Sequence, residues 1–319
     1  MKTGVRRVLI HAAHGSISLL LFVALSVFLL VYQGPYAHLV EAGGNVPSPS
    51  PTSSPTADAT TAPSTSTPAP TTLTPAPTAG PTAFPTIEGL TLLDLGEPGL
   101  LGWILLVDDP SRLFVATAPR MLKVGATVRD MVVANDAIGG INGGGFLDPN
   151  GQGNGSTPLG IVINDGKVLY QQSGVTQFKI LGFTQQDRLV TSDGMSLAEI
   201  KKADFRWAIT FGPTLVRNGK LVNLSSINVG TSRRPNPRCA LGQRADGTVV
   251  LCCIDGRNTL GRGATLELLQ QVMQKQGCVL AVNLDGGSSA TLVLFDKTVN
   301  NPCNVAGERT MPTSILISR

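Results

Sequence analysis

A segment that cannot fold divides this chain of 319 residues. Residues 47–86 contain 11 Pro, 6 Ser and 12 Thr, so three residue types supply 29 of 40 positions. Such a segment buries too little apolar surface to offset the entropy lost on ordering, and its prolines favour extended geometry. We therefore predict a Pro/Thr/Ser-rich disordered stalk over residues 37–86 and one folded domain over residues 87–319.

The amino terminus predicts a membrane anchor. Three basic residues among the first seven precede an uncharged apolar run, Ser16–Tyr32. At 1.5 Å per residue the run reaches roughly 25 Å, near the short end of a bilayer span, and the basic flank keeps the amino terminus in the cytoplasm. We interpret residues 1–36 as a cytoplasmic tip and transmembrane signal-anchor, which predicts a single-pass cell-membrane protein with its folded domain extracytoplasmic. A signal peptide cleaved near Val40-Glu41-Ala42 is the alternative.

The distribution of histidine and charge excludes several functions. All three histidines, His11, His14 and His38, lie before residue 39. The folded domain therefore lacks the imidazole that Ser-His-Asp and Cys-His hydrolases and His-ligated zinc enzymes require. The net charge is only +4 and is spread along the chain, so we expect no nucleic-acid partner.

Short apolar runs separated by Asn-Gly and Asp-Gly predict antiparallel hairpins. The expected hairpins and strands span residues 159–170, 178–191, 214–221, 241–254, 278–284 and 290–300, and helices are expected at 127–134, 196–203 and 265–276. The strand–helix–strand order before residue 284 indicates one crossover unit in an otherwise antiparallel system. The predicted fold class is α+β, a sheet-rich single domain with few helices that follows a transmembrane helix and a disordered stalk.

All five cysteines lie in the last third of the chain, and none forms a Cys-x-x-Cys pair. Cys252 and Cys253 are adjacent in a predicted strand, so their side chains face opposite sides of the sheet. We expect buried free thiols, although disulfide pairing is open to an exported domain.

Four glycine-flanked polar clusters lie at the ends of predicted strands. They are Ala137–Phe146, Ile209–Thr214, Pro237–Ala240 paired with Cys253–Arg257, and Val282–Ser289. Glycine lets a ligand approach the backbone closely and exposes N–H groups that can hold an anion. Asp-Gly and Asn-Gly pairs also build ordinary turns, which is the alternative for each cluster taken alone.

The side chains of these clusters suit a phosphate-containing substrate. Arg238 and Arg257 supply planar donors that match phosphate geometry. Asp285 and Asp255 are candidate carboxylates for proton transfer. The candidates for substrate and phosphate binding are Asn142, Gly143, Gly144, Thr210, Gly212, Arg238, Arg257, Gly286, Gly287 and Ser288.

Taken in order, the clusters resemble the phosphodiester glycosidase domain family over roughly residues 95–319. The resemblance rests on Asn142-Gly-Gly, Gly212-Pro, Pro237-Arg-x-Ala-x-Gly242, Asp255-Gly-Arg257, Asn283-Leu-Asp-Gly-Gly-Ser288 and the terminal Gly307-Glu308-Arg309 segment. Cys239 and Phe211 depart from the family pattern, in which a Thr or Ser and a small residue are commoner.

The resemblance implies a hydrolase that cleaves a sugar-1-phosphodiester in a surface glycan or polymer. Asp285, with Asp255 as the second candidate, is expected to act as base or nucleophile at the anomeric carbon. The partner is then a glycan or glycosyl phosphate, and no cofactor is expected. Two alternatives are a non-catalytic glycan-binding or wall-organising module on a stalk, and a metal-dependent phosphodiesterase with an all-oxygen Ca²⁺ or Mg²⁺ site.

Overall fold

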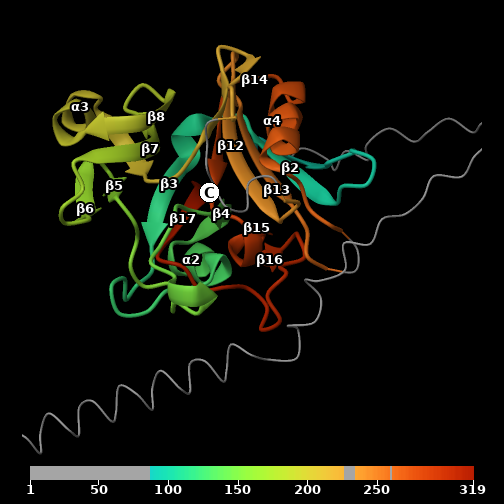
Figure 1. Ribbon diagram of the computed structural model, residues 1–319, viewed down its shortest axis with the longest axis horizontal. Helices are drawn as coiled ribbons and strands as arrows, with labels where there is room; N and C mark the ends of the chain where they lie inside the picture. The colour runs from blue at the N-terminus through green and yellow to red at the C-terminus, as the bar shows by residue number, and fades with distance from the viewer. Residues whose placement is uncertain (1–86, 226–233, 259–260) are drawn as a thin grey trace, which may run out of the picture. The chain divides into compact units, whose positions relative to one another are not determined.

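The computed structural model describes residues 87–225, 234–258 and 261–319, and all of these belong to one compact unit (Figure 1). Three antiparallel sheets and three α-helices make up this part of the chain. The predicted sheet-rich α+β domain with few helices is therefore confirmed.

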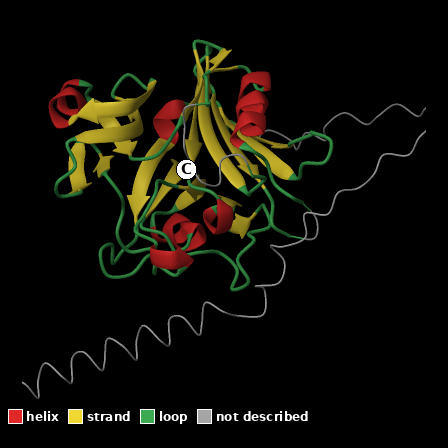
Figure 2. Cartoon of the chain, viewed as in Figure 1, coloured by secondary structure: helices red, strands yellow, loops and turns green. Residues whose placement is uncertain are grey.

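The largest sheet has seven strands in the order β1-β2-β13-β12-β14-β10-β11. Its strands are β1 (Leu90–Asp94), β2 (Gly102–Val107), β10 (Thr214–Arg217), β11 (Lys220–Leu221), β12 (Arg238–Arg244), β13 (Val249–Ile254) and β14 (Cys278–Leu284). Helix α4 (Leu266–Lys275) joins β13 to β14 and lies beside the strands in Figure 2. Because β12 pairs antiparallel with both β13 and β14, these two strands run parallel to each other. The predicted crossover unit of β13, α4 and β14 is therefore confirmed, and β12 lies between its two strands.

The second sheet has five strands in the order β16-β15-β4-β17-β3. Its strands are β3 (Leu113–Thr117), β4 (Ala137–Asn142), β15 (Leu292–Leu294), β16 (Lys297–Thr298) and β17 (Thr313–Ser318), and helix α2 (Val128–Ala134) packs on it. Strand β4 is wholly buried and contains Gly139 and Gly140. A Cβ on Gly139 would lie 2.6 Å from the carbonyl oxygen of Val293, so this strand needs glycine for close packing between its neighbours.

The third sheet also has five strands, in the order β6-β5-β9-β7-β8. Its elements are β5 (Ile161–Asn164), β6 (Lys167–Gln171), β7 (Gln177–Thr184), β8 (Leu189–Ser196), β9 (Phe205–Ile209) and helix α3 (Leu197–Lys202). Three short 3-10 helices complete the described structure, at Pro110–Arg112, Pro149–Gly151 and Gly287–Ser289.

One hydrophobic core joins the three sheets. It includes Leu251 from the seven-stranded sheet, Ile141 from the second sheet and Trp207 from the third, all fully buried. Phe183 packs on Trp207 with ring centroids 5.3 Å apart. The sheet edges are therefore held at fixed positions relative to one another, which sets the geometry of the cavity described below.

Local sequence signals predicted most elements. The Thr-x-x-Asp sequence at Thr127 and the Ser-x-x-Glu sequence at Ser196 are typical of capping boxes, and each forms one at the start of α2 and α3. In the predicted 265–276 helix, Leu266, Leu269, Val272 and Met273 are spaced to share one face, and this face is buried against the seven-stranded sheet. The turn at Asn164-Asp165-Gly166 connects β5 and β6, as its sequence indicates.

The cysteines also follow the prediction. All five are free thiols, four of them buried and Cys303 half-buried. Cys253 lies in the core shared by the three sheets, whereas Cys252 packs under α4, so the adjacent side chains do face opposite sides.

No helix within the described ranges is long and apolar enough to cross a membrane. The predicted span at residues 16–32 and the predicted stalk at residues 37–86 lie outside those ranges.

Candidate active site

The strand ends of the seven-stranded sheet create a cavity of about 510 Å³. Antiparallel pairing brings the ends of β13 and β14 to the same edge as the starts of β12 and β10. The cavity is lined by the predicted residues Gly212, Arg238, Arg257, Asp285, Gly286, Gly287 and Ser288. Gly145 and Phe146 of the first polar cluster also line the cavity, so all four clusters converge there.

Asp285 follows β14 and lies half-buried on the cavity wall. Its Oδ1 accepts a hydrogen bond of 2.9 Å from the backbone N–H of Gly286. Its main-chain carbonyl accepts one of 2.7 Å from Nδ2 of Asn142, which belongs to the second sheet. The second sheet therefore fixes the backbone position of this carboxylate.

Burial raises the pKa of Asp285 to about 6. Hydrogen bonds from Ser289 and Gly286 and the positive charge of Arg309 oppose this shift but do not cancel it, and the charge of Asp148 adds to it. The two glycines that follow Asp285 in the sequence predict two backbone N–H donors beside its carboxylate, which would keep it ionised. Only that of Gly286 donates to it, because the N–H of Gly287 donates to the carbonyl of Pro237 at 2.9 Å.

Two arginines form a cationic wall. Arg238 opens β12 and is 7% exposed, and its Nε donates to the carbonyl of Ala264 at 3.0 Å. Arg257 donates from Nε to Oδ1 of Asn236 at 2.8 Å, and its Nη1 lies 3.3 Å from where a Cβ on Gly287 would stand. Burial, and then the charge of Arg257, lower the pKa of Arg238, while Glu267 acts in the opposite sense. An anion between the two guanidinium groups would relieve this repulsion.

A second charged pair was missed by sequence reasoning. Arg309 donates from Nη2 to Oδ1 of Asp148 at 2.5 Å and from Nη1 to Oγ of Ser288 at 3.0 Å. Its guanidinium stacks over Phe146 at 5.0 Å from the ring centroid. Burial raises the pKa of Asp148, but hydrogen bonds from Arg309 and from the N–H of Gly153 outweigh burial and leave that pKa below its ordinary value.

Several further residues line the cavity although the sequence had suggested no binding or catalytic role for them individually. They include Phe146, Asp148, Asn236, Asn283, Ser289 and Arg309. Arg309 belongs to the terminal Gly307-Glu308-Arg309 segment that carries the family resemblance, and this was the one sequence feature that could have indicated a role for it.

Four predicted ligands support the cavity from outside instead of lining it. Asn142 is fully buried, and its Oδ1 accepts from the N–H of Thr291 at 3.1 Å. A Cβ on Gly143 would lie 2.5 Å from Oγ1 of Thr313, and one on Gly144 would lie 2.6 Å from the carbonyl of Thr210. Oγ1 of Thr210 accepts from the N–H of Ile161 at 2.9 Å. These residues pack the three sheets together.

Asp255 also lies outside the cavity lining. It is 2% exposed, and its carboxylate accepts hydrogen bonds from Asn300 and from the backbone and side chain of Asn301. This carboxylate holds the 300–301 segment, and Asp285 is the better placed of the two catalytic candidates.

The two positions that depart from the family pattern differ in their surroundings. Phe211 borders the cavity, and a Cβ on Gly145 would meet its ring carbons at 3.2 Å. Cys239 instead faces the core, where its Sγ lies 3.5 Å from Sγ of Cys253. Of the two, Phe211 is the one that can touch a substrate.

No group of three or more His, Cys, Asp or Glu side chains in the described ranges is arranged to hold a metal ion. The expectation of a cofactor-free reaction stays a prediction.

Comparison with known proteins assigns the family. The family profile described as "Phosphodiester glycosidase" matches residues 135–318, more than half of the chain. This chain belongs to the phosphodiester glycosidase family. The resemblance inferred from the motifs is therefore confirmed, and membership places the protein among hydrolases at the level of the family.

Curated relatives cover the same region. The N-acetylglucosamine-1-phosphodiester alpha-N-acetylglucosaminidase of Mus musculus is 30% identical over 222 residues, which are 63% of this chain and 41% of the relative. The SPbeta prophage-derived uncharacterized protein YomE of Bacillus subtilis (strain 168) is 28% identical over 203 residues, which are 60% of this chain and 29% of YomE. The chain thus spans less than half the length of these relatives.

A solved structure shares the fold. The catalytic domain of zebrafish N-acetylglucosamine-1-phosphodiester alpha-N-acetylglucosaminidase, described as auto-inhibited by its pro-peptide, superposes with a TM-score of 0.59 at 24% identity. The match covers 75% of this chain and 81% of that chain.

The raised pKa of Asp285 leads to a stability prediction. Asp285→Asn is expected to raise the free energy of unfolding at pH 7 by about 1–2 kcal/mol. This is less than the full pKa shift of Asp285 implies, because water reaches the cavity wall. The folded pKa of about 6 exceeds the ordinary 3.8, so the charged form destabilises the fold above pH 6 and this cost disappears as pH falls below 3.8. Denaturant unfolding of the full-length chain at pH 7 and pH 3.5 measures the difference.

The matched control is Asp165→Asn, an exposed turn residue outside the cavity lining. If Asp285→Asn raises the free energy of unfolding equally at pH 7 and at pH 3.5, the increase does not come from the ionisation of Asp285.

Proposed function

We propose that this protein hydrolyses a sugar-1-phosphodiester in a surface glycan or polymer. The observation that carries the proposal is the position of Asp285, with its pKa of about 6, in the same cavity as Arg238 and Arg257. Family membership and the glycosidase named among the relatives support the same reaction.

The arginine wall suits the leaving group. A phosphodiester carries one negative charge, and breaking the bond between the anomeric carbon and its oxygen leaves both bonding electrons on a phosphate monoester with a second charge. Donors placed where charge develops stabilise the transition state more than the substrate. Arg238 and Arg257 can therefore assist departure without a proton donor, because a phosphate monoester is a good leaving group.

Asp285 then serves as the base. At pH 7 a carboxyl of pKa about 6 is mostly ionised, and its basicity is close to the value most effective for proton transfer. It takes a proton from a water molecule whose oxygen forms the new bond to the anomeric carbon. This step inverts the configuration, whereas a nucleophilic Asp285 would form a covalent glycosyl-enzyme and retain it.

Asp148 is the other carboxylate in the cavity lining, and its environment gives it a different part. Its pKa lies below the ordinary value, so it stays ionised and is unsuited to donate a proton. Its hydrogen bond holds Arg309 against Phe146 and Ser288, which makes Asp148 a positioning residue for that arginine.

We propose further that the domain acts outside the cytoplasm, tethered through residues 16–32 and carried on the stalk of residues 37–86. The support is the basic flank, the uncharged apolar run and the Pro/Thr/Ser composition. A sugar-phosphate polymer at the cell surface is the matching substrate class.

Asp285→Asn is expected to lower kcat on a small sugar-1-phosphodiester by at least about 10²-fold, because the amide accepts no proton. The full-length variant should still bind a sugar-1-phosphate product, and the wild-type rate should fall below about pH 6 as Asp285 becomes protonated. Release of free sugar measures turnover, and calorimetry measures binding.

The control for that experiment is again Asp165→Asn, which should keep wild-type turnover. A variant at Asp285 that retains more than a tenth of wild-type kcat removes its catalytic role. Binding by a wild-type protein that turns over no sugar-1-phosphodiester would instead point to the non-catalytic module.

Arg257→Lys is expected to lower kcat/KM on the same diester about 10-fold. Lysine keeps the charge but loses the planar fork, so it cannot hold Asn236 and a phosphate together. Arg262→Lys is the control, an exposed arginine outside the cavity lining. If Arg257→Lys lowers the melting temperature and leaves kcat/KM unchanged, Arg257 has only a structural role.

Protease added to intact cells is expected to release a soluble, active fragment that begins within residues 47–86. Spontaneous release of a fragment that begins near Gly43 would support the cleaved signal peptide instead. Sequencing the amino terminus of the released protein distinguishes these outcomes.

A further inference from the structure

A second cavity, of about 670 Å³, shares no lining residue of the described ranges with the cavity that contains Asp285. It lies between the turn that joins β7 to β8, the end of β10 and the turn that joins β12 to β13. Each of these three elements contributes one arginine: Arg188, Arg217 and Arg244. We call this cavity the arginine groove.

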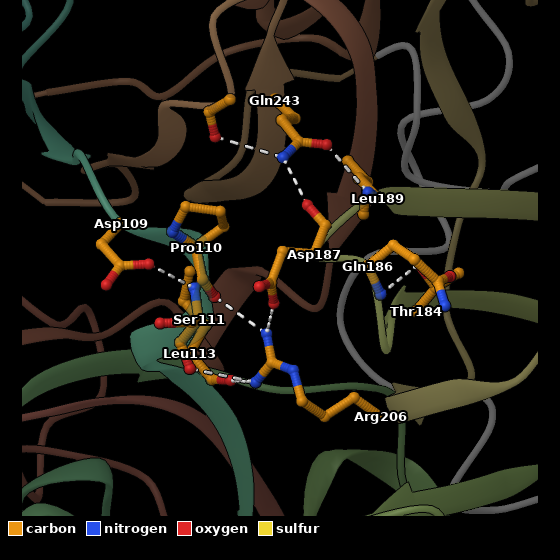
Figure 3. Close-up of polar contacts among 11 residues, drawn as sticks. Asp109, Pro110, Ser111, Leu113, Thr184, Gln186, Asp187, Leu189, Arg206 and Gln243 are labelled. Atoms are coloured by element: carbon orange, nitrogen blue, oxygen red, sulfur yellow. Dashed lines mark hydrogen bonds and ion pairs between the residues drawn. The ribbon is translucent and has the colours of Figure 1, made fainter.

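A single side chain fixes the floor of the arginine groove (Figure 3). Nε2 of Gln243 donates to the carbonyl of Asp187 at 2.9 Å and to that of Gly247 at 3.1 Å. Oε1 of Gln243 accepts from the N–H of Leu189 at 2.8 Å. Because Asp187 and Leu189 flank Arg188, Gln243 holds the backbone of Arg188 against the strand that carries Arg244.

The groove keeps a positive charge although it contains two aspartates. The carboxylate of Asp187 accepts a hydrogen bond from Arg206, whose guanidinium also donates to the carbonyls of Pro110 and Leu113 (Figure 3). Asp246 accepts from the N–H of Thr248 at 3.0 Å in its own turn. With Asp187 neutralised by Arg206, three arginines face one remaining carboxylate.

The arginines retain donors for a ligand. Arg217 uses Nη2 for a hydrogen bond of 3.3 Å to Oγ1 of Thr214, and Arg244 uses Nε for one of 2.7 Å to the carbonyl of Gln276. The side chain of Arg188 is exposed and forms no hydrogen bond or ion pair with the residues that the structure describes. Guanidinium groups that converge from separate elements match the oxygens of a phosphate.

Strand β10 connects the two cavities. Gly212, just before β10, lines the cavity that contains Asp285, and Arg217, at the end of β10, lines the arginine groove. At about 3.3 Å per residue these positions are roughly 15 Å apart. Beside Gly212 two side chains of opposite charge approach: Oδ1 of Asp193 and Cδ of Lys179 lie 3.7 Å and 3.9 Å from where a Cβ on Gly212 would stand.

We propose that the arginine groove is a second phosphate-binding site, which holds a neighbouring phosphodiester of a polymeric substrate while one sugar phosphate occupies the cavity that contains Asp285. The polymeric part rests on the proposed function. Because one short strand separates the two cavities, a small diester cannot occupy both at once, whereas a chain with repeated phosphates can.

The test is the full-length double variant Arg188→Gln, Arg217→Gln, assayed on a small sugar-1-phosphodiester and on a soluble polymer of repeated sugar phosphodiesters. KM for the polymer should rise about 10-fold at low salt, with kcat and both constants for the small diester unchanged. The rise should shrink at high salt because screening weakens these exposed charges. Arg120→Gln, Arg129→Gln is the matched control, which removes two exposed charges that line neither cavity.

An equal change in KM for the small diester and the polymer, or no change for the polymer, overturns the proposal. A change of the same size in the control variant also overturns it, because the effect would then come from net charge alone.

A binding measurement tests the arginine groove independently of the proposed reaction. Calorimetry with the full-length Asp285→Asn variant measures the affinity for the same polymer and for inorganic phosphate, with and without the two groove substitutions. Loss of polymer affinity on substitution supports the groove even where the wild-type protein hydrolyses neither substrate, an outcome that would refute only the reaction. Inorganic phosphate bound in the groove as tightly as the polymer would identify a site for the free ion and overturn the polymeric part.

Discussion

The hydrogen bonds of the buried Asn142 carboxamide are the contacts on which the geometry of the cavity around Asp285 depends. Its Nδ2 donates to the carbonyl of Asp285, and its Oδ1 accepts from the N–H of Thr291. An amide with both groups satisfied in a fully buried position cannot rotate without leaving a polar atom unpaired. The end of β14 is therefore held in one position against the second sheet, and the glycines that follow Asn142 let the sheets approach closely enough for this contact.

Opposing electrostatic effects then divide the cavity into parts with different chemistry. Desolvation dominates at Asp285 and raises its pKa to about 6. At Asp148 desolvation acts in the same sense, but the hydrogen bonds from Arg309 and Gly153 together with the charge of Arg309 outweigh it and keep the pKa of that carboxyl below its ordinary value. Two carboxylates with separated pKa values suit separate tasks. Arg238 and Arg257 repel each other on the remaining wall, so that wall is prepared for an anion before any substrate arrives.

The sequence predicted the elements of the fold because their signals are local. The capping boxes at Thr127 and Ser196 involve residues three positions apart, and the apolar face of α4 repeats with the period of a single helix. Strand β4 was not predicted as a strand because Gly139 and Gly140 lack the β-branched side chains that mark one. Glycine is needed at these positions because Val293 and Leu316, more than 150 residues away in the chain, pack so close to the strand that a Cβ would clash with them.

The same distinction applies to the site. Sequence alone determined that residues 87–319 contain no histidine, and its motifs indicated the family and named Asp285, Arg238 and Arg257 as candidates. Only the tertiary structure separated residues that line the cavity from residues that support it, such as Asn142, Thr210 and Asp255. Only the tertiary structure brought Arg309 to Asp148, across 161 residues. The reason is physical: a motif records which side chain is present, whereas its pKa and its partners depend on burial and on charges that strands from distant parts of the chain bring together.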